Sequence, residues 1–196
     1  MSDEARLKIL LVGPVKAGKS MIANYLAGVS QNLQGDYHGT VALRILEFER
    51  EIATTKKQWQ GATKKVQIEL WDCSGDRKYE NGWSAIKEGA DGVVIVFNPE
   101  NKKAENEIQN WHNHFVQTQG LKDNQCMILA HNSSGEATAP KFNKKLPHSL
   151  SKVPLFNTSL DTDAELTRNE FDNLVNSVSK EKFEKRDNEE LSILGE

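Results

Sequence analysis

The segment 13–20 reads GPVKAGKS, which fits the spacing of a phosphate-binding P-loop, Gly-x-x-x-x-Gly-Lys-Ser. Glycine at the two fixed positions lets the backbone turn its N–H groups inward as a cradle for an anion. Lys19 can reach the β- and γ-phosphates of a nucleotide, and the Ser20 hydroxyl can ligate Mg²⁺. The residues expected to line this phosphate site are Gly13, Val15, Lys16, Ala17, Gly18, Lys19, Ser20 and Met21.

Three further residues could complete a nucleotide site. Asp72 follows the alternating stretch 66–71 and could hold a water of Mg²⁺, while Gly75 could bring a backbone N–H to the γ-phosphate. Thr40 could place its hydroxyl on Mg²⁺ and order its loop when triphosphate is bound. Asp-x-x-Gly also forms ordinary turns, and threonine before a strand is common. The expected metal ligands are Ser20, Thr40 and Asp72.

Apolar runs and helical periodicities indicate the elements that must position these residues. Short apolar runs alternate with amphipathic stretches, which is typical of a parallel sheet covered by helices on both faces. Ligands of such sheets bind at the carboxyl ends of the strands, where the P-loop falls. The expected strands are 7–12, 43–48, 66–71, 92–97, 126–130 and 153–156, the second and third forming an antiparallel edge pair. The expected helices begin near Lys19 and span 105–119 and 163–178.

The remaining stretches are polar and are expected to form connections. We expect a surface loop over 28–39, a long connection over 49–65, short helical stretches within 72–89 and a polar insertion over 131–152. His112 and His114 are expected to be solvated or capping. A nucleotide-binding domain over residues 1–180 would be followed by a charged tail over 181–196, as a frayed helix or without structure.

Composition excludes several classes of function. The chain has 25 Lys and Arg against 28 Asp and Glu, so its net charge of −3 gives no signal for binding nucleic acid. The cluster Lys141, Lys144 and Lys145 lacks interleaved aromatic residues and is expected to be a solvated face. Two cysteines indicate buried thiols in a reducing compartment. Without a membrane-spanning run, a prenylation cysteine or a myristoylation glycine, we expect a soluble cytosolic protein with no lipid anchor of its own.

Segments 13–20, Thr40 and 72–75 resemble, in order and spacing, the first three motifs of the Ras-like small GTPases. Segments 44–49, 71–80, 92–98 and 125–131, with Trp83, are more narrowly similar to the Rab-like GTPase subunits of intraflagellar transport complex B. The resemblance implies a P-loop NTPase fold with a six-stranded, mostly parallel sheet and binding of GTP or GDP with Mg²⁺. It also implies docking on the coiled-coil subunits of complex B, in the cytoplasm and the cilium or flagellum, including the basal body region.

The sequence departs from the Ras-like pattern at residues that favour hydrolysis. Asp76 stands where these enzymes usually have the glutamine that orients the attacking water, and Val15 stands where many have glycine. A carboxylate facing phosphate is disfavoured, and a branched side chain can crowd the transition state. We therefore expect very slow intrinsic GTP hydrolysis and assign no catalytic residue.

The base-reading motif is altered as well. Asn132 matches the first residue of Asn-Lys-x-Asp, but Ser133 and Gly135 replace the lysine and the aspartate that contacts guanine. Glu136 could substitute, and Ser159 with Leu160 resembles the loop whose backbone reads the guanine O6. Guanine is expected on the grounds of resemblance, with weaker discrimination against adenine.

Three functions remain open at this point. The first is a nucleotide-dependent docking adaptor, which Asp76 and the missing prenyl cysteine favour. The second is a competent GTPase switch of vesicle or ciliary trafficking, in which an activating protein supplies the missing groups. The third is a P-loop phosphotransfer enzyme with 131–152 as a lid. In the adaptor, Tyr79 and Trp83 would either contact the partner or pack their helix onto the sheet.

Overall fold

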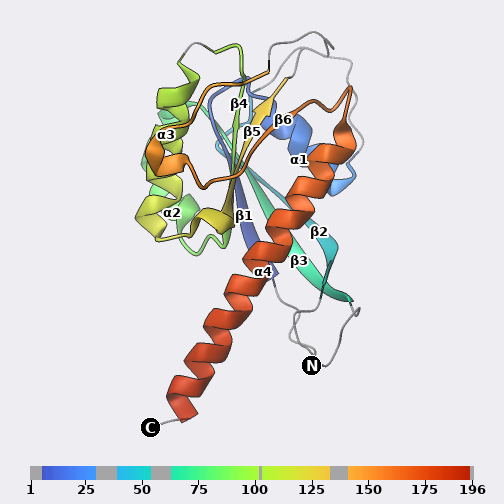
Figure 1. Cartoon of the computed structure of the whole chain (residues 1–196), viewed down its shortest axis with the longest axis vertical. Coiled ribbons are helices and arrows are strands. Elements are labelled where there is room, and N and C mark those ends of the chain that lie inside the picture. The colour runs from blue at the N-terminus through green and yellow to red at the C-terminus, as the bar shows by residue number, and fades with distance from the viewer. Residues whose placement is uncertain (1–5, 30–38, 54–62, 102, 133–140, 195–196) are drawn as a thin grey trace.

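The computed structural model describes residues 6–29, 39–53, 63–101, 103–132 and 141–194. The described strands form one six-stranded sheet of order β2-β3-β1-β4-β5-β6, in which β2 is antiparallel to β3 and every other pair is parallel (Figure 1). The strands are β1 (Arg6–Val12), β2 (Leu43–Ala53), β3 (Thr63–Cys73), β4 (Gly92–Phe97), β5 (Cys126–His131) and β6 (Leu155–Thr158). The expected α/β fold with an antiparallel edge pair is confirmed.

Helices cover both faces of this sheet (Figure 1). The helices are α1 (Lys19–Ala27), α2 (Trp83–Lys87), α3 (Ala104–Phe115) and α4 (Ala164–Leu194). Short 3-10 helices are η2 (Arg77–Gly82), η3 (Gln117–Gln119), η4 (Asp123–Gln125) and η5 (His148–Leu150). Among the described residues, no helix combines the length and the apolar character that a membrane span requires.

The alternation of side chains along β1 explains the two-faced core. Leu7, Ile9 and Leu11 join the side chains of α1 and α4 in one buried cluster. Leu10 and Val12 point to the opposite face and join the side chains of α2 and α3 in another. Because both clusters are buried, each face of the sheet must carry helices. The loops at the carboxyl ends of the strands are thereby held between two packed layers.

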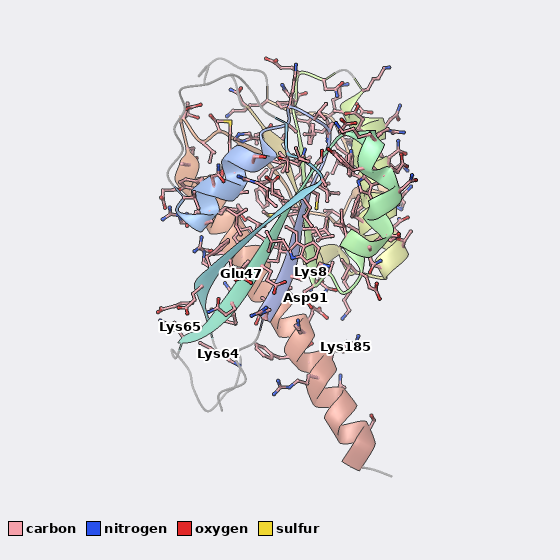
Figure 2. All side chains as sticks on the ribbon, turned by 180° about the vertical axis from the view of Figure 1, so that it is seen from behind. Lys8, Glu47, Lys64, Lys65, Asp91 and Lys185 are labelled. Atoms are coloured by element: carbon pink, nitrogen blue, oxygen red, sulfur yellow. The ribbon has the colours of Figure 1, made fainter. Side chains whose placement is uncertain are left out.

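The β2–β3 pair is longer than expected. The two strands pair over eleven residues each, from Leu43 opposite Cys73 to Ala53 opposite Thr63, so the ends of the expected connection 49–65 are strand. Polar side chains stabilise this outer part across the strands, because Lys65 lies 3.3 Å from Glu49, to which Gln67 also donates. Figure 2 shows Lys64 and Lys65 near the end of the pair. The tip, residues 54–62, lies outside the described residues.

The last strand and the last helix also differ from expectation. β6 begins at Leu155 rather than at residue 153, because the Val153 N–H is used to close the turn onto the Leu150 oxygen. Helix α4 continues through the charged segment to Leu194. Glu181 explains part of this continuation, since it binds Lys122 and Asn124 across the helix interface. The predicted domain boundary at residue 180 stays a prediction.

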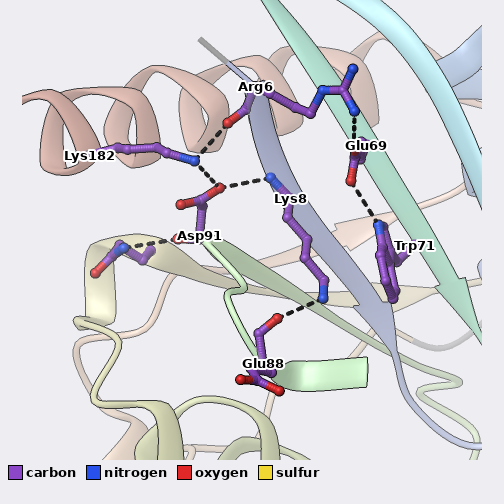
Figure 3. A network of polar contacts seen from close by, with 8 residues as sticks. Arg6, Lys8, Glu69, Trp71, Glu88, Asp91 and Lys182 are labelled. Atoms are coloured by element: carbon purple, nitrogen blue, oxygen red, sulfur yellow. Dashed lines mark hydrogen bonds and ion pairs between the residues drawn. The ribbon is translucent and has the colours of Figure 1, made fainter. Parts of the chain in front are cut away.

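Lys182 fixes α4 to the start of β1. Its ammonium donates to the backbone oxygen of Arg6 at 2.7 Å and to Asp91 Oδ2 at 2.8 Å, and the same carboxylate oxygen accepts the Lys8 N–H (Figure 3). Lys8 in turn places its ammonium 3.6 Å from the centre of the Trp71 ring. These contacts lie at the amino end of β1, opposite the P-loop.

The two histidines of α3 are less exposed than expected. His112 is 2% exposed, so the expectation of a solvated ring is wrong for it. The chain after α3 returns close enough for Asp123 to act on this ring, yet burial dominates and lowers the pKa of His112. His114 is half-buried, and its ring packs edge-on against Trp83. Lys141, Lys144 and Lys145 are exposed, as expected for a solvated face.

Candidate functional site

The P-loop connects β1 to α1 and packs against the end of β4. Gly13 has a φ of 139°, and a Cβ built there would fall 1.9 Å from the backbone oxygen of Val96. A side chain is therefore excluded at this position. Lys16 has a φ of 60°, so the loop includes the left-handed turn that directs successive N–H groups to one side. Gly18 stands immediately before α1, whose positive end faces the loop.

The other residues of the loop differ in exposure. Ala17 is buried and anchors the loop in the core, whereas Val15 is 52% exposed at its outer side. Ser20 and Met21 are half-buried in the first turn of α1. The backbone cradle of the loop therefore lies between the buried Ala17 and the exposed Val15.

Lys19 supplies the positive charge of the cradle. Its ammonium donates to the backbone oxygens of Gly13 and Pro14 at 2.9 and 2.7 Å, so the side chain folds back over the loop. Burial lowers the pKa of Lys19 to about 8, although the negative charge of Asp72 opposes this shift. A phosphate group in the cradle would supply the negative charge that this buried ammonium lacks.

Three side chains from separate elements converge beside Lys19. Ser20 Oγ on α1 lies 2.8 Å from Thr40 Oγ1, and the Thr40 hydroxyl donates to Asp72 Oδ2 at 3.4 Å. Asp72 is fully buried near the end of β3, and its second carboxylate oxygen, Oδ1, has no partner among the described residues. The sequence predicted that these three residues share a site, and the fold brings them together.

Arg44 also belongs to this cluster, although sequence reasoning did not identify it. Its guanidinium contacts Asp72 Oδ2 through Nε at 3.2 Å and through Nη2 at 3.1 Å. Arg44 lies directly opposite Asp72 in the β2–β3 ladder. Arg44 could have been identified from the register between β2 and β3, but a single sequence does not specify that register.

Gly75 packs directly against the backbone of the P-loop. A Cβ at this position would lie 2.3 Å from the Gly13 oxygen and 2.5 Å from the Val15 nitrogen. The segment after β3 can approach the cradle this closely only because residue 75 has no side chain. The backbone of this segment is fixed by a hydrogen bond in which the Ser74 N–H donates to the oxygen of Ala42.

Asp76 begins the 3-10 helix η2. Its carboxylate accepts the Lys78 N–H at 3.1 Å, and the Lys78 ammonium lies 3.0 Å from the other oxygen. These contacts hold the pKa of Asp76 below its usual value. The carboxylate is therefore ionised at neutral pH, with its charge directed to Lys78.

Residues expected to contact the base follow β5 and β6. The Asn132 N–H donates to the Thr158 oxygen at 2.8 Å, which joins the ends of these two strands. Ser159 is 7% exposed, and Leu160 packs against the cluster beneath α4. Ser133, Gly135 and Glu136 lie outside the described residues.

His131 was not identified from the sequence. It is the last residue of β5, fully buried, and its Nδ1 lies 3.2 Å from Thr158 Oγ1. A Cβ at Gly18 would fall 2.4 Å from the His131 ring, so this side chain supports the end of the P-loop. Burial lowers the pKa of His131 to about 4, which keeps the ring neutral at physiological pH.

The phosphotransfer alternative requires a lid over residues 131–152, which the structure describes in part. In the expected lid, the described part 141–152 carries Phe142 and Leu150, which are buried in the core cluster of α2 and α3. This part is packed and cannot open as a lid without exposing Phe142 and Leu150.

Trp83 is 6% exposed and packs on Trp111, with ring centres 4.7 Å apart. Of the two uses considered for Trp83, packing is the one observed.

Comparisons with known proteins agree with this geometry. The family described as Ras of Complex, Roc, domain of DAPkinase matches residues 8–134. An intraflagellar transport protein 22 homolog of Homo sapiens is 39% identical over 189 residues, which cover 96% of this chain and 98% of that protein.

Solved structures give the same result. A GTP-bound crystal structure of T. brucei IFT22/74/81 matches with a TM-score of 0.71 at 33% identity, over 93% of this chain and 99% of that one. A GDP-bound crystal structure of T. brucei IFT22 matches with a TM-score of 0.67 at 30% identity, over 91% of this chain and 99% of that one.

Proposed function

The chain belongs to the family of intraflagellar transport protein 22 homologues, which have a Ras-like domain, and from this premise we propose that it binds GTP and GDP with Mg²⁺ at the P-loop. It acts as a nucleotide-dependent docking subunit of intraflagellar transport complex B. Its partners are the coiled-coil subunits of that complex, related to those crystallised with the T. brucei protein. It works in the cytoplasm and the cilium or flagellum, including the basal body region.

The observation that carries nucleotide binding is the convergence of Ser20, Thr40 and Asp72 beside the P-loop. Hydroxyl and carboxylate oxygens are the ligands that Mg²⁺ prefers, and Asp72 Oδ1 is buried without a partner among the described residues. These residues fit the metal: Ser20 and Thr40 would hold it directly, and Asp72 would hold it through water. When bound, Mg²⁺ neutralises charge on the β- and γ-phosphates.

The P-loop accounts for the phosphates. Positive electrostatic potential at the cradle comes from three sources: the backbone turn, the N-terminus of α1 and the Lys19 ammonium. Thr40 lies against Ser20 and Gly75 lies against Gly13 and Val15, so both are placed to respond to a γ-phosphate. Loss of that phosphate would release both segments, which is how nucleotide state reaches the surface of Ras-like domains.

Slow hydrolysis is supported by the position of Asp76. Its carboxylate caps η2 and pairs with Lys78, so it offers no amide to orient an attacking water. The phosphates are bound without a residue in the role of the usual glutamine. Nucleotide binding then serves to form a docking surface, and the bound GTP is hydrolysed only slowly.

Calorimetric titration of the nucleotide-free protein with GTP and with ATP, both with Mg²⁺, tests the choice of base. We expect tighter binding of GTP, because Asn132 and Ser159 resemble in sequence the residues with which Ras-like domains read guanine. ATP binding of equal or higher affinity contradicts the proposal. The nucleotide that remains bound during purification gives an independent answer.

Nucleotide-dependent docking is tested by capture of the coiled-coil partners. Ser20→Asn removes a proposed metal ligand, and we expect the variant to lose most of its GTP-dependent capture. Ser149→Asn is the matched control, because Ser149 is an exposed residue of η5, outside the P-loop and the segments that approach it. Equal capture by wild type and Ser20→Asn would show docking that is independent of nucleotide.

A further inference from the structure

Arg44 connects three elements at the proposed metal site. It lies on β2 opposite Asp72 of β3, and its guanidinium binds Asp72 Oδ2 through Nε and Nη2 at 3.2 and 3.1 Å. The same Nη2 donates to Asn24 Oδ1 on α1 at 2.9 Å. The guanidinium is therefore held in place by partners on both sides.

The carboxylate that Arg44 contacts is in an unusual position. The Asp72 side chain is fully buried, and a buried carboxylate is strongly destabilising unless a positive charge or hydrogen bonds compensate it. Among the described residues, Arg44 is the one cation within ion-pair distance of Asp72. The ammonium of Lys19 interacts with the same charge from farther away and donates its hydrogen bonds to P-loop carbonyls. Oδ1 is left without a partner in the same part of the chain.

A divalent cation at Ser20, Thr40 and Asp72 would interact with the same carboxylate. A guanidinium and Mg²⁺ in the same small site repel each other, and each compensates the charge of Asp72 in the absence of the other. Arg44 is 44% exposed at its side chain, so it has room to move towards solvent. The Asp72 carboxylate cannot move towards solvent in the same way, because its side chain is buried inside the fold.

We propose that Arg44 is a resident counter-charge of the metal site, which stabilises the metal-free protein and thereby weakens its binding of Mg²⁺. This inference rests on the proposed function, because it requires Mg²⁺ at these residues. Arg44 is a positioning residue and not a ligand. It keeps Asp72 in place while the site lacks metal, and it makes retention of Mg²⁺, and with it nucleotide exchange, sensitive to the concentration of free Mg²⁺.

The experiment uses the full chain loaded with GDP and titrates MgCl₂ by calorimetry. R44Q keeps a hydrogen-bonding side chain but removes the charge. We expect its Mg²⁺ midpoint to fall by about three- to tenfold, and about tenfold corresponds to about 1.4 kcal/mol. R44K keeps a point charge without the planar fork, and we expect its midpoint to stay within about twofold of wild type.

Thermal unfolding with EDTA and with MgCl₂ gives a second readout. R44Q is expected to lower the unfolding temperature in EDTA much more than in Mg²⁺, because Mg²⁺ replaces the missing charge. R50Q is the matched control: Arg50 lies on the same strand and pairs with Asp172 at 3.1 Å, away from the P-loop. We expect R50Q to lower both temperatures equally and to leave the Mg²⁺ midpoint unchanged.

The outcomes separate this inference from the proposed function. Absence of any Mg²⁺ effect on wild type overturns the metal site and the inference together. A Mg²⁺ effect on wild type with the same midpoint in R44Q overturns the inference alone. If R44Q does not fold even with Mg²⁺, N24A decides, because it removes the second anchor of Arg44: a lowered midpoint supports the inference, and an unchanged one overturns it.

Discussion

Asp76 and Lys78 form a closed pair at the start of η2, in which the Asp76 carboxylate accepts the Lys78 N–H and binds the Lys78 ammonium at 3.0 Å. A side chain used in this way is not available to orient water at a γ-phosphate. The two residues are close neighbours in the chain, so the pair forms independently of the nucleotide. It therefore supports the proposal of slow hydrolysis independently of the missing amide.

The first prediction concerns Asp76→Gln. The glutamine supplies both a donor and an acceptor for water and leaves the Lys78 pair, so we expect intrinsic GTP hydrolysis to rise by about tenfold or more. Single-turnover assays with preloaded GTP measure the rate. Asp76→Asn is the control, because its shorter amide can still cap η2. Wild-type hydrolysis as fast as in typical Ras-like enzymes would contradict the premise.

The second prediction concerns the contact between Gly75 and the P-loop. In Gly75→Ala the added Cβ meets backbone atoms of Gly13 and Val15 at 2.3 and 2.5 Å, and backbone cannot yield as a flexible side chain can. We expect a loss of about 1–3 kcal/mol in the free energy of unfolding and weaker GTP binding. Chemical denaturation and calorimetry measure the two effects.

Gly82→Ala is the matched control for this substitution. No atom of the described residues lies within 4 Å of a Cβ at Gly82, and its φ of −87° suits alanine. We expect little change in stability or in GTP affinity. Equal behaviour of the two variants would mean that the segment after β3 does not need to approach the loop.

Much of the fold was predictable because the buried strands carry a strong signal. β4 is apolar on both faces, and its predicted bounds agree with those observed. The outer parts of β2 and β3 were missed because Glu49 and Lys65 are typical of loops when read singly. In the sheet they contact each other across the pair, and a cross-strand contact cannot be seen in a linear pattern.

The same reason separates the predicted from the missed residues of the site. Ser20, Thr40 and Asp72 have recognisable positions relative to glycines and strands, so their convergence could be predicted. Arg44 and His131 act through register and packing: one lies opposite Asp72, and the other lies against Gly18. Both residues lie in segments that carry the family resemblance, but their types and spacing gave them no chemical role, and only the folded chain brings them to the site.

The third prediction separates packing from docking in the segment before β4. Trp83 packs on Trp111 and Phe115, with ring centres 4.7 and 5.4 Å away, so Trp83→Ala should cost about 3–5 kcal/mol of stability. Tyr79 is half-buried and contacts Lys78 at its ring. We expect Tyr79→Ala to retain stability and to weaken capture of the coiled-coil partners. Denaturation and capture assays on both variants check this division, which a stable Trp83→Ala protein would refute.

The last prediction follows from the lowered pKa of Lys19. Below about pH 8 the ammonium is charged in the folded and unfolded states alike, so its burial penalty is constant. Between about 8 and 10.5 the unfolded chain binds more protons at Lys19 than the folded one, so the contribution of Lys19 to the stability of the nucleotide-free protein should rise with pH in this window. The buried thiols of Cys73 and Cys126, whose pKa values burial raises, contribute in the opposite direction, so this rise is read from the difference between wild type and a Lys19 variant. Lys19→Met should remove this rise.

Nucleotide binding reverses the shift, because phosphate favours the charged ammonium of Lys19. At about pH 8.5, binding of GDP should take up a substantial fraction of a proton, and its affinity should fall as the pH rises further. Calorimetry in buffers of different ionisation enthalpy counts these protons. At about pH 6.5 the ammonium is already charged, so the same protein should bind GDP without uptake by this group. Equal proton uptake at the two pH values would show that Lys19 does not meet the phosphates.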